Sequence, residues 1–195
     1  MDTEATRNKW NERYRNADAV VPGPAWVLQQ YASLLPDGGV ALELASGLGG
    51  NAIFLAERGF AVTAWDISDV AVRTLQNFAL SRGLLLDAEV RDVEQAPPPP
   101  VSADVVVVSH YLHRPLFEHL TAALRPGGLL YYQTWSADRP AGAGGPTNPD
   151  FLLQRNELLR AFSALDVLVF HDEGAAGDPA LGLFGQSAIV ARKAA

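Results

Sequence analysis

Residues 40–66 constrain the fold more than any other part of the chain. An apolar run over 40–45 leads into the glycine-rich turn 46–50, a helical stretch follows, and a second apolar run ends at Asp66. A strand that breaks into a glycine turn and opens a helix is typical of open α/β sheets that bind adenosine-type ligands. We therefore expect a crossover unit with a ligand site at the carboxyl ends of its strands.

The alternation of strands and helices continues along the chain, which predicts a parallel sheet built from crossover units. Apolar runs predict strands over 40–45, 61–65, 85–90, 104–108, 129–134, 166–170 and 187–191, and helical patterns predict helices over 24–35, 51–58, 68–82, 115–124 and 151–162. Ser68 is a suitable N-cap for the third of these helices. Within 104–108 the four valines 105–108 are consecutive, which predicts a central strand covered on both faces.

Two low-complexity stretches interrupt this pattern. The four prolines 97–100 lie between the third and fourth strands. Ten extended residues reach at most ~33 Å, more than the about 14 Å of three strand spacings, so 93–102 is expected to connect the strands without a helix rather than to serve as a proline-rich ligand. The stretch 139–146, rich in glycine and proline, predicts a loop; within the longer segment 137–150 it is a candidate lid.

Composition excludes several classes of protein. The chain has 195 residues, no cysteine and a formal net charge of -7 without a basic cluster, so we expect one domain, no disulfide and no nucleic acid partner. The four histidines lack the spacing of a zinc site, and no metal is expected. No apolar run could span a membrane and the N-terminus lacks a secretory signal. We expect a cytoplasmic, bacterial-type protein, either a monomer or a homodimer.

Two kinds of ligand fit the glycine turn. Residues 47–52 satisfy the dinucleotide pattern G-x-G-x-x-A, and Asp66 lies about twenty residues further on, where it could bind ribose hydroxyls. A nicotinamide-dependent oxidoreductase is therefore one hypothesis. Glu43 within the first strand and Asp92 after the third favour a different kind of ligand. Carboxylates would repel a pyrophosphate beside them, whereas they would attract a cationic amino-acid ligand.

The order of these motifs is similar to that of the class I S-adenosylmethionine-dependent methyltransferases. The resemblance extends from about Trp10 to the C-terminus and rests on 43–49, Asp66, Asp92-Val93, 104–109 and 124–128. Through 9–14 and 145–149 the chain most resembles small bacterial methyltransferases of the tellurite-resistance type. The resemblance implies an α/β fold, a Rossmann-like three-layer sandwich whose seven-stranded, mostly parallel sheet has the order 3-2-1-4-5-7-6, with the last strand antiparallel. It implies a single domain over 1–195, with 1–36 as an N-terminal helical cap segment.

The resemblance also implies the cofactor, S-adenosyl-L-methionine, with S-adenosyl-L-homocysteine as product. The loop 45–49 would contact its methionine part, Asp66 its ribose and Ile67 its adenine, while Asp92 and the Val93 N–H would bind the adenine edge. The full set of candidate cofactor-binding residues is Trp10, Arg13, Glu43, Ala45, Ser46, Gly47, Gly49, Asn51, Asp66, Ile67, Asp92, Val93 and Ser109.

Several of these residues also have structural interpretations. Glu43 could cap a neighbouring helix, although a carboxylate inside an apolar strand is costly to bury unpaired. Asp66 and Asp92 could be turn residues at strand ends. Trp10 and Arg13 have helical spacing and could pack an N-terminal helix onto the domain instead of covering the cofactor.

The candidate catalytic residues follow the fourth strand. His110 is placed to take a proton from an oxygen or nitrogen acceptor, with Tyr111 beside it, and Arg114 could hold an anionic substrate or pair with an acid near a helix start. Methyl transfer needs in-line positioning, and a base is optional. A small-molecule acceptor is expected; its identity is not encoded in any motif. A non-catalytic S-adenosylmethionine-binding module remains a third hypothesis.

Overall fold

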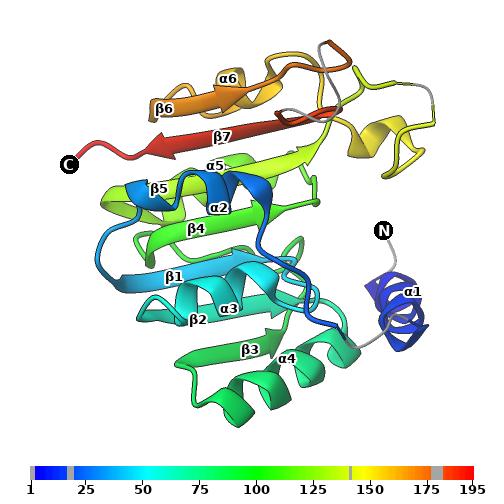
Figure 1. Ribbon diagram of the computed structural model, residues 1–195, viewed down its shortest axis with the longest axis vertical. Coiled ribbons are helices and arrows are strands. Elements are labelled where there is room, and N and C mark those ends of the chain that lie inside the picture. The colour runs from blue at the N-terminus through cyan, green and yellow to red at the C-terminus, as the bar shows by residue number, and fades with distance from the viewer. Residues whose placement is uncertain (1–2, 17–19, 141, 177–181) are drawn as a thin grey trace.

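The computed structural model describes residues 3–16, 20–140, 142–176 and 182–195, so parts of the predicted cap segment and of the loop 137–150 lie outside the described residues. Seven strands form one sheet in the order β3-β2-β1-β4-β5-β7-β6, in which β7 runs antiparallel to both neighbours (Figure 1). The predicted topology is therefore confirmed. The strands span Gly39–Leu44 (β1), Phe60–Asp66 (β2), Leu86–Val90 (β3), Ala103–Ser109 (β4), Leu124–Trp135 (β5), Asp166–His171 (β6) and Gln186–Arg192 (β7).

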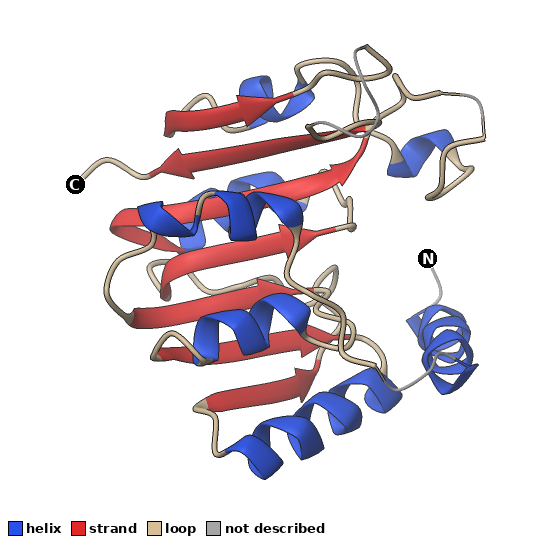
Figure 2. Cartoon of the chain, viewed as in Figure 1, coloured by secondary structure: helices blue, strands red, loops and turns tan. Residues whose placement is uncertain are grey.

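Helices cover both faces of the sheet and give three layers (Figure 2). One face carries α2 (Trp26–Gln30), α3 (Gly50–Ala56) and α4 (Asp69–Arg82), and the other carries α5 (Leu116–Ala123) and α6 (Glu157–Ala161). Helix α1 (Thr3–Asn16) belongs to neither layer. It lies beyond the carboxyl ends of the strands, beside the start of α4 (Figure 1).

Strand β4 divides the hydrophobic core into two halves. Val105 and Val107 pack into the cluster under α2, α3 and α4, while Val106 and Val108 pack into the cluster under α5 and α6. All four are essentially inaccessible to solvent. The expectation of a strand covered on both faces is confirmed, because side chains of a strand alternate between faces and here each face meets a layer of helices.

Local sequence signals determine where helix α4 begins and ends, as expected. The Ser68 hydroxyl accepts a hydrogen bond from the Ala71 N–H at 3.2 Å, and Gly83 ends α4 in the left-handed conformation, with φ 62°. The connector 91–102 forms turns and extended backbone, as predicted, and runs from β3 to β4 without a helix. Arg91 holds it by donating to the carbonyls of Ala96 and Pro97.

Two predicted helices are wrong in extent. The helix predicted over 24–35 is only α2, which ends at Gln30; Tyr31 (φ -110°) follows it, and the chain continues as a 3-10 turn, Ala32–Leu34. The helix predicted over 151–162 is a 3-10 turn, Pro149–Phe151, and the short helix α6. Between them Leu153 is fully buried and bridges to Ser136, so packing on the sheet replaces helical hydrogen bonds there.

Candidate functional site

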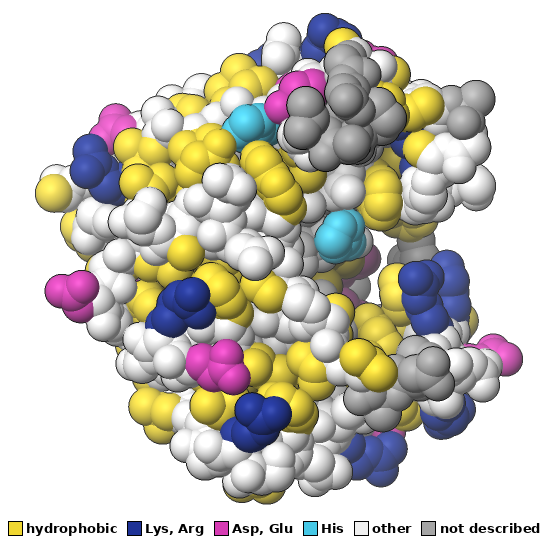
Figure 3. Space-filling view, viewed as in Figure 1, with side chains coloured by type: hydrophobic (Ala, Val, Ile, Leu, Met, Phe, Trp, Pro, Cys, Tyr) yellow, Lys and Arg dark blue, Asp and Glu magenta, His cyan; other side chains and the backbone are white. Residues whose placement is uncertain are grey.

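A cavity of about 860 Å³ opens at the carboxyl ends of β1 to β5. The space-filling view shows a hollow beside α1 on this side of the molecule (Figure 3). Its volume lies within the ~300–1,000 Å³ of small-molecule sites, and its position is where open α/β sheets bind ligands. It is lined by Thr3, Thr6, Lys9, Trp10, Arg13, Tyr14, 22–26, Glu43, 45–48, Gly50, Asn51, Asp66, Ile67, 91–94, 109–112, Thr134, Trp135, Gly145, Pro146 and Phe151.

The turn after β1 forms the floor of the cavity. Ala45 has φ 51°, a conformation that disfavours any residue with a Cβ, and Ser46 donates its N–H to the Trp65 carbonyl at 3.0 Å. The Ser46 hydroxyl is buried, and among the described residues it has no hydrogen-bond partner. Buried polar groups without a partner are uncommon in folded proteins, so this hydroxyl is a candidate to bind a molecule in the cavity.

The three glycines of this turn are explained by contacts within the protein. A Cβ on Gly47 (φ 53°) would lie 2.7 Å from the Tyr14 hydroxyl, and one on Gly50 would lie 2.6 Å from the Gly23 carbonyl oxygen. Gly49, the one predicted cofactor residue outside the cavity lining, has φ 78° and faces the methyl groups of Leu75. The turn therefore lets α1, the segment before α2, and α4 approach closely, and only Gly47 and Gly50 also border the cavity.

We expect Gly49→Ala to lower the free energy of unfolding by about 2–5 kcal/mol, the sum of left-handed strain and overpacking. The new Cβ would lie 2.4 Å from Leu75 Cδ1, and Leu75 is fully buried. Gly59→Ala is the matched control, since Gly59 has φ 86° but no atom within 4 Å of such a Cβ. Denaturant unfolding should show the larger loss for Gly49→Ala, and equal losses would contradict the packing role.

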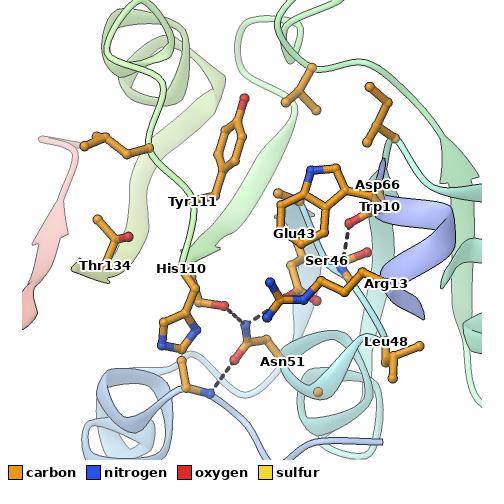
Figure 4. Close-up of a pocket in the computed structure, with 18 of the residues that line it drawn as sticks. Trp10, Arg13, Glu43, Ser46, Leu48, Asn51, Asp66, His110, Tyr111 and Thr134 are labelled. Carbon is orange, nitrogen blue, oxygen red and sulfur yellow. Dashed lines mark hydrogen bonds between the residues drawn. The ribbon is translucent and has the colours of Figure 1, made fainter. Parts of the chain in front are cut away.

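Glu43 and Asn51 form a buried network behind the cavity (Figure 4). The Glu43 carboxylate accepts hydrogen bonds from Asn51 Nδ2 at 2.7 Å and from the Ala52 N–H at 2.8 Å, so it caps the start of α3. Asn51 also donates to the Ser109 hydroxyl at 2.9 Å and accepts from the Ala25 N–H at 2.7 Å. Burial raises the pKa of Glu43 to about 8, against the lowering effect of these hydrogen bonds. The network joins β1, β4 and α3 to the segment before α2.

Asp66 ends β2 with its carboxylate at the cavity. It accepts the Gly47 N–H at 2.7 Å and the Ser68 N–H at 2.8 Å, and it is almost fully buried. Burial raises the pKa of Asp66, and the backbone hydrogen bonds oppose that rise. Asp66 thus ties the turn after β1 to the start of α4 and still borders the space that a ligand would fill, as does the neighbouring Ile67.

Asp92 and Val93 border the cavity after β3. Asp92 accepts the Thr3 hydroxyl at 2.7 Å through one carboxylate oxygen and the Glu94 N–H at 3.0 Å through the other. Val93 is buried. The contact with Thr3 shows that the first residue of α1 reaches the same carboxylate that was predicted to meet a ligand.

Helix α1 forms one wall of the cavity. Trp10 stacks on Tyr14 with ring centroids 5.8 Å apart, and the Arg13 guanidinium lies 5.3 Å from the Trp10 ring centroid. The helix is fixed to α4 by Asn11, which is buried, accepts the Ser68 hydroxyl at 2.6 Å and donates to Asp69. Helix α1 therefore packs on α4, as one of the two interpretations predicts, and it also borders the cavity.

Residues 109–111 approach the cavity from the end of β4. His110 has φ 54°, and its ring centroid lies 5.5 Å from that of Trp135. Burial lowers the pKa of His110, which favours the neutral form of the ring. The Tyr111 hydroxyl donates to Glu94 at 3.1 Å, and burial raises the pKa of Tyr111.

Arg114 lies outside the cavity lining, unlike the other two candidate catalytic residues. Its guanidinium donates to both carboxylate oxygens of Glu157 at 2.7 and 3.1 Å, and to the carbonyls of Asp150 and Leu152. The acid it pairs with begins α6, so the structure shows the ion-pair alternative and places Arg114 under the segment that leads into that helix.

Several lining residues were not predicted. Trp26 and Trp135 bring two large aromatic side chains to the cavity, Thr134 lies just before Trp135 at the end of β5, and Lys9 adds a cation from α1. Trp135 and Thr134 could have been found from their place at the end of a predicted strand. Trp26 had no such signal, because it reaches the cavity only through the way α2 crosses the sheet.

Many solved structures share this fold, and three of the most similar are each below 25% identical in sequence to this chain. TehB from Haemophilus influenzae has a TM-score of 0.71 at 17% identity, with 96% of this chain and 66% of that chain covered. A protein studied for the conversion of a disulfide bond into a thioacetal group during echinomycin biosynthesis has a TM-score of 0.71 at 22% identity, covering 97% and 92%. Geranyl diphosphate C-methyltransferase from Streptomyces coelicolor A3(2), in complex with S-adenosyl-L-homocysteine, has a TM-score of 0.70 at 15% identity, covering 98% and 97%.

The fold and the site at its carboxyl edge define the class: this chain has the class I S-adenosylmethionine-dependent methyltransferase fold. Residues 41–128, from β1 to the glycines within β5, match the family model described as "Methyltransferase domain". This match and the shared fold confirm the resemblance seen in the sequence. This chain spans about two thirds of the length of TehB. No curated protein matches it.

S-adenosyl-L-methionine is the cofactor of this class, and the described residues fit it. The unpartnered Ser46 hydroxyl, the carboxylates of Asp66 and Asp92, and the cations of Lys9 and Arg13 all border one cavity. These groups match the ammonium, carboxylate and ribose hydroxyls of such a molecule. Among the described residues no group of three potential metal ligands occurs, and no helix is both long and apolar enough to cross a membrane.

Proposed function

We propose that this protein transfers a methyl group from S-adenosyl-L-methionine to a small-molecule acceptor. The observation that carries the proposal is the single cavity that joins the acids at the ends of β2 and β3 to the turn after β1 and to α1. When bound, the cofactor supplies an electrophilic methyl group. The protein's part is to bind both molecules, align them and exclude water.

The proposed cofactor contacts follow the order of the strands. Asp66 binds the ribose hydroxyls, Ile67 packs on the adenine, and Asp92 with the Val93 N–H binds the adenine edge. The loop 45–47 and the Ser46 hydroxyl receive the methionine part, and Arg13 of α1 faces its carboxylate. Glu43 and Asn51 support this loop from behind, since their polar atoms already bond to α3 and to Ser109.

The acceptor is proposed to bind beside His110, Trp26 and Trp135. These side chains and Phe151 border the cavity on the side away from the predicted adenine contacts. An aromatic surface favours an acceptor with an apolar or planar body. The size of the cavity, shared with the cofactor, favours a small molecule over a macromolecule, and we propose that residues 1–195 act as one domain.

Calorimetric titration with S-adenosyl-L-homocysteine, NAD and NADP tests this proposal. We expect micromolar binding of S-adenosyl-L-homocysteine alone. Binding of a dinucleotide only would support the oxidoreductase hypothesis instead and would contradict the proposal. Tight cofactor binding without methyl transfer to any acceptor in a broad screen would favour the non-catalytic module, since a fold hosts more than one function.

A further inference from the structure

Helix α2 is held in place by side chains of other elements. It has five residues, and a helix of that length is not stable by itself. At its start, the Ala25 N–H donates to Asn51 Oδ1 at 2.7 Å. At its end, the Tyr131 hydroxyl donates to the Tyr31 carbonyl at 3.0 Å. The place of Trp26, the first residue of α2, is therefore set by contacts with α3 and β5.

Tyr31, His171 and Glu173 form a hydrogen-bond chain outside the cavity lining. The Tyr31 hydroxyl lies 2.7 Å from His171 Nε2, and His171 Nδ1 lies 2.8 Å from Glu173 Oε1. A carboxylate only accepts, so His171 Nδ1 carries a hydrogen, and in the neutral ring Nε2 then accepts from the Tyr31 hydroxyl. A ring that is bonded at both nitrogens cannot turn without losing a hydrogen bond. The hydrogen-bond chain therefore fixes the plane of the His171 ring.

The indole of Trp26 packs against two rings of this hydrogen-bond chain. Its centroid lies 5.0 Å from that of His171 and 5.9 Å from that of Tyr31, and interplanar angles of 86° and 81° make both contacts edge-to-face. Trp26 is half-buried, and it also borders the cavity. The hydrogen-bond chain that begins at Glu173 thus reaches the cavity wall through the orientation of one indole.

Trp135, the second indole on the acceptor side of the cavity, is packed differently. The ring centroid of His110 lies 5.5 Å from that of Trp135, and a Cβ on Gly145 would lie 2.5 Å from Trp135 Cδ2. All three residues border the cavity, so they cover one another where an acceptor would bind. Trp26 instead makes its ring contacts with residues outside the cavity lining. Its remaining indole surface is therefore the better platform for an acceptor.

We propose that Trp26 is a specificity-determining residue that favours acceptors with a planar aromatic body, and that Tyr31, His171 and Glu173 are positioning residues that hold its indole at the cavity. Aromatic rings pair with an indole in preferred geometries and gain more than their buried area provides, whereas a saturated ring lacks this gain. The inference rests on the proposed function, because it names the class of acceptor for the same site.

Two matched alcohols test the specificity. 2-Naphthol is planar and aromatic, and decahydro-2-naphthol has the same carbon skeleton and hydroxyl group without aromatic rings. The dissociation constants of both are measured by NMR titration of the protein saturated with S-adenosyl-L-homocysteine. We expect Trp26→Leu to weaken binding of 2-naphthol about 2- to 10-fold more than binding of decahydro-2-naphthol. Phe54→Leu is the matched control, since Phe54 is half-buried on α3 and lies outside the cavity lining.

Equal losses for the two alcohols in Trp26→Leu would overturn the proposal, as would a failure of 2-naphthol to bind the wild-type protein. If Trp26→Leu does not fold, the wild-type complex decides. Intermolecular nuclear Overhauser effects between 2-naphthol and the Trp26 indole are expected, and their absence at saturation would contradict the contact.

His171→Leu tests the positioning role, because it removes both hydrogen bonds without removing a residue of the cavity lining. We expect the preference for 2-naphthol to fall as in Trp26→Leu, while the affinity for S-adenosyl-L-homocysteine stays within about 2-fold of wild type. Tyr31→Phe keeps the ring and loses only the hydroxyl, so a smaller fall in the same direction is expected. His119→Leu, at an exposed position, is the control.

A wild-type preference for 2-naphthol in folded His171→Leu would overturn the positioning role. If His171→Leu does not fold, Tyr31→Phe decides by the same criterion. The proposed function fails separately, if S-adenosyl-L-homocysteine does not bind. The same two titrations on the protein alone then still show whether Trp26 selects the planar alcohol.

Discussion

Asp66→Ala is expected to weaken binding of S-adenosyl-L-homocysteine about 10- to 150-fold, which corresponds to about 1.5–3 kcal/mol for hydrogen bonds to a charged group. The variant is also expected to lose about 2–4 kcal/mol of unfolding free energy. Its carboxylate accepts the Gly47 and Ser68 N–H groups, and both donors would be left without their partner in a buried place. Calorimetric titration and denaturant unfolding measure the two effects.

Asp87→Ala is the matched control, because Asp87 lies on the adjacent strand β3 with an exposed side chain. It should change neither quantity by more than about 0.5 kcal/mol. Should Asp66→Ala not fold, Asp66→Asn keeps one acceptor oxygen for the turn and should show a smaller loss of both. A folded Asp66→Ala protein with wild-type affinity would refute the ribose contact.

Glu43→Gln is expected to remove a pH dependence of stability. The pKa of Glu43 is raised to about 8 by burial, with the charge of Asp66 adding to the rise. Between the ordinary carboxyl pKa and about 8 the folded protein holds a proton that the unfolded chain has lost. The unfolding free energy of the wild type should therefore fall as the pH rises from about 5 to 8, by about 3–5 kcal/mol in total from this group.

In Glu43→Gln the side chain at position 43 carries no charge at any pH. The free energy of unfolding of this variant should therefore fall less over the same pH range. Glu43→Gln removes one of the two oxygens that accept hydrogen bonds from Asn51 and Ala52, which lowers the free energy of unfolding by about 1–3 kcal/mol at low pH. The difference in free energy of unfolding between the variant and the wild type should therefore narrow or reverse toward pH 8. Glu57→Gln, at an exposed position, is the control and should follow the wild-type curve. Parallel curves for Glu43→Gln and the wild type would contradict the raised pKa.

Elements with a strong period were predictable from the sequence alone. Strand β4 and helix α4 carry their signals locally, in consecutive valines and in the N-cap Ser68, and both formed as expected. The prediction of a helix over 151–162 was wrong because the apolar residues of this segment fit a helical pattern as well as they fit contacts with the sheet. Leu153 contacts the sheet and forms a β-bridge with Ser136. Periodicity cannot decide between the two when a neighbouring strand competes for the backbone.

Several predicted site residues make structural contacts that the spacing of the sequence motifs does not predict. Gly49 was expected at the ligand and instead faces Leu75, and Arg114 pairs with Glu157 away from the cavity. Both outcomes depend on neighbours far along the chain. Thr3, which lies 89 residues before Asp92 in the sequence, reaches that carboxylate because α1 lies at the carboxyl edge of the sheet.

The sequence by itself determined the class of fold and the edge of the sheet where the site lies, and it implied the cofactor only through the resemblance of its motifs to a known family. Those properties follow from local patterns, an apolar strand, a glycine turn and an acid at a strand end, which have few alternatives once they occur in order. The tertiary structure alone decided how α1 and Trp26 enclose the cavity. Which side chains reach the cavity depends on how segments far apart in the sequence pack across the carboxyl edge of the sheet, and no local pattern encodes that packing.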